Sequence, residues 1–487
     1  MNKAAVPCGR PSCMNTQESS LAAEWKPPTS LWEVSERLKY NQPLNPGDPL
    51  WVDTSPGRSL GYERLYRSLG VDARGSDPRD WILRVRHDRH YGVLCGHRGS
   101  GKSTELRLIA SRLHQPGLFH VVFLDVLADL DINNLQYPDL FLALAHRLFA
   151  SVQATGVELE STYLTPLVQW FRERVVVNAK LTEIKASLEA GGQAAASVPF
   201  LASLFAKLSA SFMAQSQEKE EVRVVFKSSF KEFAQAFNTL AAHVQARLGD
   251  AGKGKALLFI VDGTDRLDGD DSHAFFLANI HQLQQLDGLF LYCMPIHLAA
   301  MGAKALAAFD HVTKVPCLKL REKHDPAQST LPTPDSKCME VLRTIILRRA
   351  PAPLFDPDPV ATGNWQTVDR IAELSGGHLR DLVRLLDYAF QHATGDRFDA
   401  RSVEKAAQSL ASDYKRALAP EDFRLLVEID RAGKDHVPGS EQAHKLLFNL
   451  SLLEYNDFWW QSHPVVRLLP AYGATLRQSM DAPQPAP

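Results

Sequence analysis

Three glycines, then a lysine followed by two hydroxyl residues, stand close together in the stretch CGHRGSGKSTEL, residues 95–106. Their spacing matches G-x-x-x-x-G-K-[ST], in which glycines let successive backbone N–H groups turn inward around phosphate oxygens. A helix that opens at Lys102 adds its positive end, and the lysine supplies a charge for the β- and γ-phosphates. The pattern predicts a nucleotide site with these cofactor-binding residues: Gly96, His97, Arg98, Gly99, Ser100, Gly101, Lys102, Ser103 and Thr104.

Magnesium bound to such a nucleotide needs oxygen ligands from the protein. The Ser103 hydroxyl can supply one, and Asp262, at the end of the apolar run 257–262, can hold the ion through water. Three residues later, Asp265 is placed to orient the attacking water, although a helix cap or a turn residue is the alternative. We therefore predict Ser103 and Asp262 as metal ligands, with Lys102 and Asp265 among the catalytic residues.

The scaffold that must position these groups is predicted from short apolar runs. Five runs are bounded by turns or helical segments: residues 90–96, 119–126, 255–263, 287–296 and 313–320. Continuous apolar runs that alternate with helices favour a parallel sheet covered on both faces. We expect an α/β fold, with a mostly helical insertion at about 130–250 between the second and third runs.

A chain of 487 residues is long enough for two to four domains. We expect the following division: a partly disordered N-terminal extension (1–74), a nucleotide-binding core (75–337), a helical lid (338–400), a winged-helix-like domain (401–480) and a disordered tail (481–487). The winged helix is predicted from helices followed by two apolar runs around a turn at Asn456-Asp457. Within the extension, residues 40–59 are expected to lie across a domain surface, and residues 60–89 to be helical.

The phosphate motif, the D-x-x-D-R run at 262–266 and the Gly-Gly-x-x-Arg helix start at 376–380 resemble the AAA+/STAND branch of P-loop ATPases. The run FIVDGTDRL is similar to the signature of KAP-type NTPases. The resemblance implies a five-stranded sheet of order 5-1-4-3-2, a helical lid, a C-terminal winged helix, and ATP with Mg²⁺ as cofactors. It also implies that Arg380 is a catalytic sensor arginine at the γ-phosphate; an arginine on the helix surface is the alternative.

The chain departs from the pattern of that family in three places. Gly263-Thr264-Asp265 replaces the usual acidic pair, and the fourth apolar run ends without a polar sensor, for which His297 is a substitute or a structural residue. The segment 297–311, where an arginine finger is expected, has no arginine, which leaves these candidates: Arg343, Arg348 and Arg349. Arg266 can pair with a local acid or reach across an interface. These departures favour a slow switch over fast hydrolysis in a ring.

Three functions remain open. The first is a regulatory ATPase that hydrolyses ATP with Mg²⁺ to switch conformation or assembly, with bacterial signalling or defence among its settings and a second copy or another protein as partner. The second is a DNA-handling ATPase similar to origin-recognition or transposition ATPases. The third is a nucleotide-binding scaffold that does not hydrolyse. DNA is the less favoured partner, because the net charge is −2 and the hairpin 452–463 carries no lysine or arginine.

Cysteine usage and hydropathy indicate the cellular compartment in which we expect the protein. The six cysteines form no close pairs, which favours a reducing, cytoplasmic setting. The N-terminal stretch has no continuous apolar region of the kind a secretory signal needs. No stretch reaches the roughly 18 apolar residues of a membrane-spanning helix; the nearest, 190–206, is rich in small residues and precedes Lys207.

Overall fold

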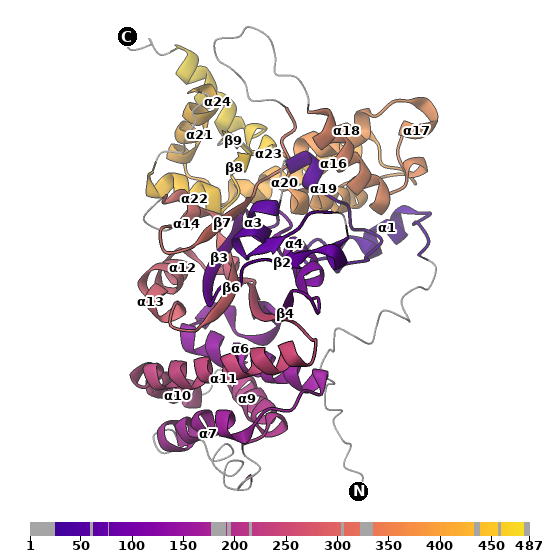
Figure 1. Cartoon of the computed structure of the whole chain (residues 1–487). Helices are drawn as coiled ribbons and strands as arrows, with labels where there is room; N and C mark the ends of the chain where they lie inside the picture. Colours follow the sequence, from indigo (N-terminus) through magenta and orange to yellow (C-terminus); the bar gives the residue numbers. More distant parts are fainter. Residues whose placement is uncertain are drawn as a thin grey trace, which may run out of the picture.

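The computed structural model (Figure 1) describes residues 25–58, 62–75, 77–176, 191, 196–213, 217–302, 306–321, 335–432, 439–455 and 459–481. The predicted turn at Asn456-Asp457 and most of the two predicted disordered ends lie outside these residues.

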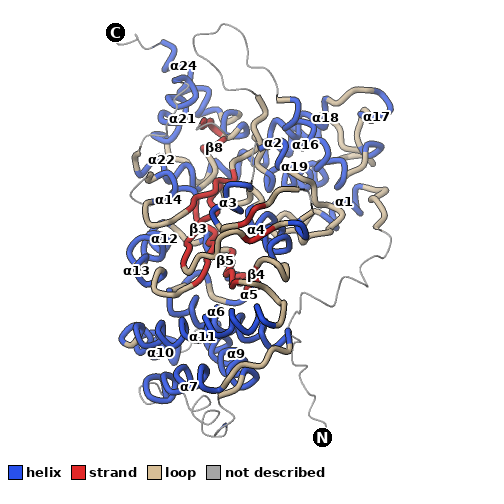
Figure 2. Tube along the Cα trace, viewed as in Figure 1, coloured by secondary structure: helices blue, strands red, loops and turns tan. Residues whose placement is uncertain are grey.

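A parallel five-stranded sheet forms the centre of the molecule (Figure 2). Its strands are β3 (Arg89–Gly96), β4 (Phe119–Asp125), β5 (Ala256–Asp262), β6 (Gly288–Pro295) and β7 (His311–Val315). They lie in the order β4-β5-β6-β3-β7, which is the expected 5-1-4-3-2 order counted from the other edge. The predicted fold class, an α/β protein with a parallel sheet, is confirmed. The fifth run ends earlier than expected, because Pro316 follows Val315 and has no N–H for a strand ladder.

Side chains alternate between the two faces of the sheet, as the two-residue period of a strand requires. Leu258 and Ile260 pack with helix α4 (Lys102–Leu113), which follows β3 directly. Phe259 packs on the opposite face with the helices of the insertion. Helix α4 buries Leu106, Ile109, Ala110 and Leu113, a spacing of three and four residues that forms one apolar face.

The insertion is helical, as expected. It contains α6 (Tyr137–Thr155), α7 (Ser161–Trp170), a π-helical turn (Phe171–Val176), α9 (Val198–Met213), α10 (Gln217–Ser228) and α11 (Phe230–Asp250). Its helices cover one face of the sheet and gather at the end of the molecule opposite the lid (Figure 1). Helices α10 and α11 meet at Ser229, whose carbonyl accepts a hydrogen bond from the Trp170 indole at 3.2 Å.

The segment predicted as a lid contains α16 (Ser336–Arg349), α18 (Gln366–Leu374) and α19 (Leu379–His392), which we together call the lid. They share one hydrophobic core with the elements that follow: α20 (Ala400–Lys415), α21 (Pro420–Ala432), α22 (Glu441–Phe448), β8 (Leu452–Tyr455), β9 (Trp459–Ser462), α23 (Pro464–Arg467) and α24 (Pro470–Asp481). Strands β8 and β9 pair antiparallel and form what we call the C-terminal hairpin. The winged-helix assignment stays a prediction.

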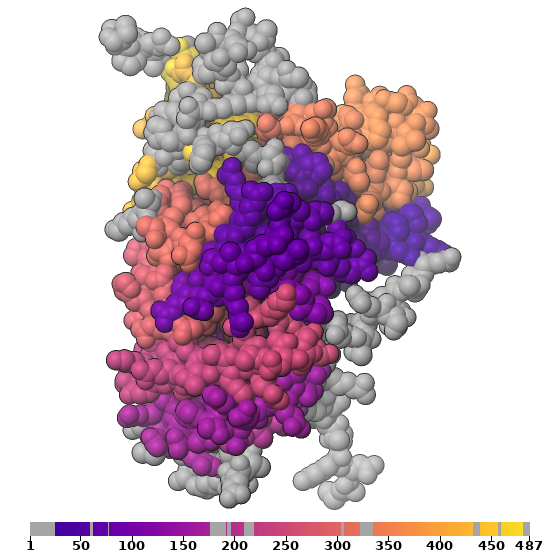
Figure 3. All heavy atoms as spheres, viewed as in Figure 1, coloured from indigo at the N-terminus to yellow at the C-terminus, as the bar shows by residue number. Residues whose placement is uncertain are grey.

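The N-terminal residues lie across the core, between the insertion and the lid (Figure 3). They form α1 (Leu31–Arg37), α2 (Ser55–Arg58) and α3 (Glu63–Ser68), then the short antiparallel pair β1 (Val71–Asp72) and β2 (Ile82–Leu83). The expectation of helix throughout 60–89 is therefore wrong after Ser68, where Gly70 has a φ of 81° and starts a turn into β1. The other short helices are α5 (Val126–Asp129), α12 (Gly269–His273), α13 (Ile280–Leu283), α14 (Ile296–Ala300) and α17 (Pro359–Thr362). None of the helices in the described part of the chain is both apolar enough and long enough to cross a bilayer.

Candidate nucleotide site

The phosphate loop, residues 96–103, connects β3 to α4 and needs glycine for two separate reasons. Gly99 and Gly101 have φ angles of 95° and 99°, in the left-handed region that other residues avoid. A Cβ atom on Gly99 would also lie 2.7 Å from the Cβ of Arg380, which is closer than real contacts allow. The predicted loop therefore has the backbone that its glycine pattern implies, and the lid stands directly against it.

Three successive carbonyls of the loop accept hydrogen bonds from outside it. The His378 side chain donates to the Arg98 carbonyl at 2.9 Å, and the Arg380 backbone N–H donates to the Gly99 carbonyl at 3.1 Å. The Arg58 guanidinium donates to the Ser100 carbonyl. The C=O and N–H of a trans peptide point in opposite directions. Anchoring these carbonyls outward therefore turns the following N–H groups toward the other side of the loop, as a phosphate site requires.

Lys102 is buried and fully bonded by protein groups. Its ammonium donates to the carbonyls of Gly96 at 2.9 Å and His97 at 2.7 Å, and pairs with an Asp265 carboxylate oxygen at 2.7 Å. The lysine and the predicted catalytic aspartate thus lie in direct contact. To bind a phosphate, Lys102 must exchange at least one of these bonds.

The two predicted metal ligands also lie together. The Ser103 hydroxyl donates to Asp262 at 2.9 Å, and Asp262 ends β5 next to Asp125 of β4. Burial, then the charge of Asp265, raises the pKa of Asp262 to about 6, against the opposing hydrogen bond from Ser103. A hydroxyl beside a carboxylate whose charge is poorly compensated fits a hard divalent cation such as Mg²⁺.

Asp265 follows the left-handed Gly263, whose φ is 90°, in a short 3-10 turn (Thr264–Arg266). Burial raises the pKa of Asp265, but Lys102 together with Arg266 outweighs it and holds that pKa below its usual value. Cys293 of β6 lowers the same pKa further. Sequence reasoning missed Cys293, because a cysteine within an apolar strand carries no signal beyond that of a small core residue.

The lid brings Arg380 to the loop, in a corner that it shares with Arg98 and Arg266. Burial, then Arg98 and Arg266, lowers the pKa of Arg380 to about 10. Its buried Nε has no hydrogen-bond partner among the described residues. Positive charge therefore accumulates beside Asp265, which favours an anion there.

The rest of the site comes from the N-terminal extension, whose residues 40–59 were expected to lie across a domain surface. A cavity of about 390 Å³ runs from Ser103, Asp265 and Arg380 to residues 39–54 and the lid residue Arg349. The Leu44 backbone N–H donates to the Thr104 hydroxyl at 3.1 Å, which fixes this segment against the start of α4. The segment has turn residues and no motif, so its position follows only from the fold.

Of the remaining candidates, Arg349 lines the cavity and the others are bonded elsewhere in the chain. His297 lies 3.0 Å from the Ser272 hydroxyl and does not line the cavity, and burial lowers its pKa to about 4, which favours the structural alternative. Arg343 pairs with Asp369 at 2.6 Å. Arg348 donates to backbone carbonyls of the N-terminal extension, and Arg349 lines the cavity.

No protein-family model and no curated protein sequence matches the chain. Similar solved structures include a Walker-type ATPase of Pyrococcus abyssi, which is 12% identical to this chain. The match covers 90% of this chain and 98% of the ATPase, with a TM-score of 0.34. Cdc6p from Pyrobaculum aerophilum is 11% identical, covering 88% and 99%, with a TM-score of 0.31. The RuvB Holliday junction branch migration motor of Thermotoga maritima is 13% identical, covering 84% and 94%, with a TM-score of 0.30.

TM-scores of this size establish no common fold. The class of the protein rests instead on the strand order and on the glycine loop between β3 and α4, which together define the P-loop NTPase fold.

Proposed function

We propose that the chain binds ATP with Mg²⁺ between the phosphate loop, the N-terminal extension and the lid, and hydrolyses it slowly as a conformational switch. The observation that carries this proposal is the pair of contacts at one end of the cavity: Ser103 with Asp262 at 2.9 Å, and Lys102 with Asp265 at 2.7 Å. These four side chains are the ones that phosphoryl transfer needs.

Each side chain has a distinct part in the proposed reaction. The loop N–H groups and Lys102 bind the phosphate oxygens, while Ser103 and Asp262 hold Mg²⁺, which neutralises charge on the transferred group. Asp265 orients the attacking water, and Arg380 stabilises charge on the terminal phosphate.

The Lys102–Asp265 pair supports slow, regulated turnover. While the lysine neutralises Asp265, that carboxylate is a poor acceptor for a water proton. When Lys102 moves to the phosphates, Asp265 is released to act on water. Nucleotide binding and activation of the base are then one event.

Contacts of the lid with the phosphate loop would transmit the change that nucleotide binding causes. Backbone and side-chain groups of residues 378 and 380 hold the loop carbonyls, and the C-terminal hairpin holds the loop through the Glu454 backbone N–H, which donates to His97 Nε2 at 2.7 Å. ATP can shift these parts only if it binds one arrangement better than another. Assembly with a second copy or binding of another protein would sense that shift.

The described residues of the C-terminal hairpin and of α22 do not favour the DNA-handling alternative. Both strands of the C-terminal hairpin are largely buried, and Glu454 lies within it, paired with Lys314 at 2.7 Å. The one lysine of α22, Lys445, lies 3.6 Å from Asp422. A hairpin that packs on the phosphate loop presents no basic surface to a duplex.

Release of phosphate from ATP with Mg²⁺ tests the proposal. We expect slow release from the wild type, none from Lys102→Ala, and a loss of about a hundredfold in Asp265→Asn with ATP binding retained. Asp270→Asn, an exposed acid close by in the sequence, is the matched control. Binding without any release from the wild type would leave the scaffold as the function.

A further inference from the structure

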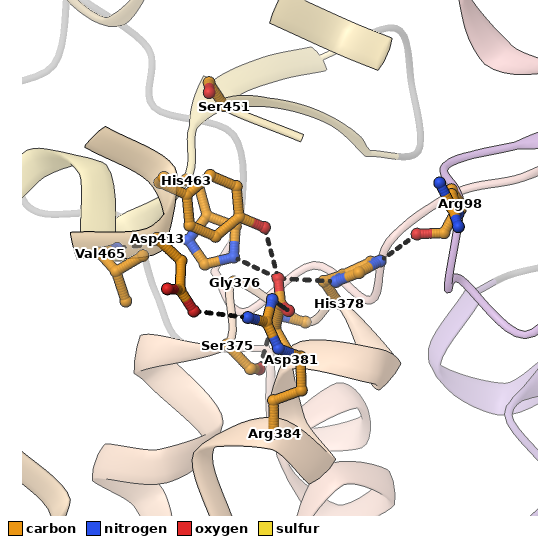
Figure 4. A network of polar contacts seen from close by, with 12 residues as sticks. Arg98, Ser375, Gly376, His378, Asp381, Arg384, Asp413, Ser451, His463 and Val465 are labelled. Atoms are coloured by element: carbon orange, nitrogen blue, oxygen red, sulfur yellow. Dashed lines mark hydrogen bonds and ion pairs between the residues drawn. The ribbon is translucent and has the colours of Figure 1, made fainter. Parts of the chain in front are cut away.

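Asp381 of α19 is a fully buried carboxylate with three hydrogen-bond partners and a further histidine nitrogen around it (Figure 4). Its Oδ1 accepts from Arg384 at 3.0 Å. Its Oδ2 accepts from the Tyr414 hydroxyl at 2.6 Å and lies 3.0 Å from His378 Nδ1 and 3.2 Å from His463 Nε2. Arg384 is a permanent cation that can only donate, so its pairing at 3.0 Å marks Asp381 as an anion.

His378 bridges this anion and the phosphate loop. Its Nδ1 faces the Asp381 carboxylate at 3.0 Å, and its Nε2 faces the Arg98 carbonyl at 2.9 Å. Both partners are acceptors only, so both ring nitrogens must carry a proton. The hydrogen-bond partners thus assign His378 as an imidazolium.

The two neighbouring histidines are assigned differently by the same reasoning. His463 Nδ1 accepts from the Val465 N–H at 3.3 Å, and His97 Nε2 accepts from the Glu454 N–H. Each therefore has one unprotonated nitrogen, and burial lowers the pKa of both. His378 is the one cation among the three.

The charged and titratable groups around His378 come from several elements packed against it. Asp381, Arg384 and Arg380 lie on α19, Tyr414 on α20 and His463 before α23, with His97 and Arg98 in the phosphate loop. Asp381 is the one anion in this set, and it contacts the ring directly.

We propose that His378 is a positioning residue that, as an imidazolium, holds the Arg98 carbonyl outward and so orients the phosphate loop, with Asp381 as its counter-ion. The inference rests on the proposed nucleotide site, since it assigns a function to the backbone of that site. With the carbonyl held by the lid, the Gly99 N–H of the same peptide points to the opposite side of the loop. Asp381 extends the connection to α20 and α23 through Tyr414 and His463.

Selective ¹⁵N labelling of histidine in the full chain tests the assignment directly. We expect both nitrogens of His378, identified by the signal that disappears in His378→Asn, to show the shifts of a protonated ring at pH 7. His120, whose pKa burial lowers to about 4, is the neutral reference in the same spectrum. A neutral His378 at pH 7 would overturn the proposal, whether or not the chain binds a nucleotide.

Binding of a fluorescent ATP analogue with Mg²⁺ tests the positioning role. His378→Gln keeps a donor near the Nε2 position, so we expect binding close to wild type. His378→Asn keeps a donor near Nδ1 and loses the loop contact, so we expect binding about tenfold weaker. The exposed His281→Gln variant is the control and should follow wild type.

Equal affinities in His378→Gln and His378→Asn would refute the positioning role. No binding by the wild type would instead refute the proposed nucleotide site, and the spectrum would still decide the protonation of His378.

Discussion

Replacing Gly99 with alanine perturbs the contact between the phosphate loop and the lid with the least possible change in chemistry. The φ of Gly99 is 95°, and an added Cβ would lie 2.7 Å from Arg380 Cβ and 2.9 Å from His378 Nε2. The Arg380 atom is the root of its side chain and cannot rotate away. The lid must therefore move if the loop keeps its shape.

Two costs determine the size of the effect. A left-handed conformation costs a residue with a Cβ about 1–2 kcal/mol. Loss of the charged hydrogen bond from His378 to the Arg98 carbonyl adds about 1.5–3 kcal/mol. We expect Gly99→Ala to lower the free energy of unfolding by about 2.5–5 kcal/mol and to weaken binding of ATP with Mg²⁺.

Urea denaturation and ATP titration measure the two effects on the same samples. Gly117→Ala is the matched control, because a Cβ there meets no atom within 4 Å and Gly117 has no positive φ. A stability of Gly99→Ala within about 0.5 kcal/mol of that control would contradict the described contact of lid and loop.

Three other variants test separate parts of the structure. Asp262→Asn should abolish Mg²⁺-dependent hydrolysis. The same variant should raise the melting temperature of the nucleotide-free protein at pH 8, because a carboxyl whose pKa rises to about 6 on folding costs stability above that pH. An unchanged or lower melting temperature would contradict the pKa shift. For the same reason, Mg²⁺ affinity of the wild type should fall about tenfold per pH unit below 6. Arg380→Ala should lower kcat more than it raises KM, measured by steady-state phosphate release, and the reverse pattern would argue against contact with the terminal phosphate. Arg223→Ala breaks a buried pair with Asp139 in the insertion, so denaturation should show a loss of about 3–5 kcal/mol with ATP affinity retained in the folded protein.

The parts of the fold that could be predicted are those determined by residues that lie close together in the sequence. The strands were predictable because a sheet buried on both faces leaves continuous apolar runs, and the phosphate loop because its backbone demands glycine at Gly99 and Gly101. Asp262 was predictable for a related reason, since the carboxyl end of a buried strand is where parallel sheets present polar groups.

The parts that could not be predicted depend on contacts between distant segments. Residues 39–54 line the cavity only because the chain returns across α4, and Leu44 carries no sign of its bond to Thr104. Cys293 resembles any small core residue until β6 places it beside Asp265. Asp381 and His378 look like ordinary helix-start residues, and their roles follow from the arrival of Tyr414 and His463 from later helices.

Calorimetric titration of ATP into the full chain, with and without Mg²⁺, tests the central claim most directly. We expect saturable binding to the wild type that Mg²⁺ strengthens, binding at least about tenfold weaker in Lys102→Ala, and no effect of Mg²⁺ in Asp262→Asn. A wild type that binds no ATP at millimolar concentration, or that binds it no better than Lys102→Ala does, would contradict a nucleotide site at this loop.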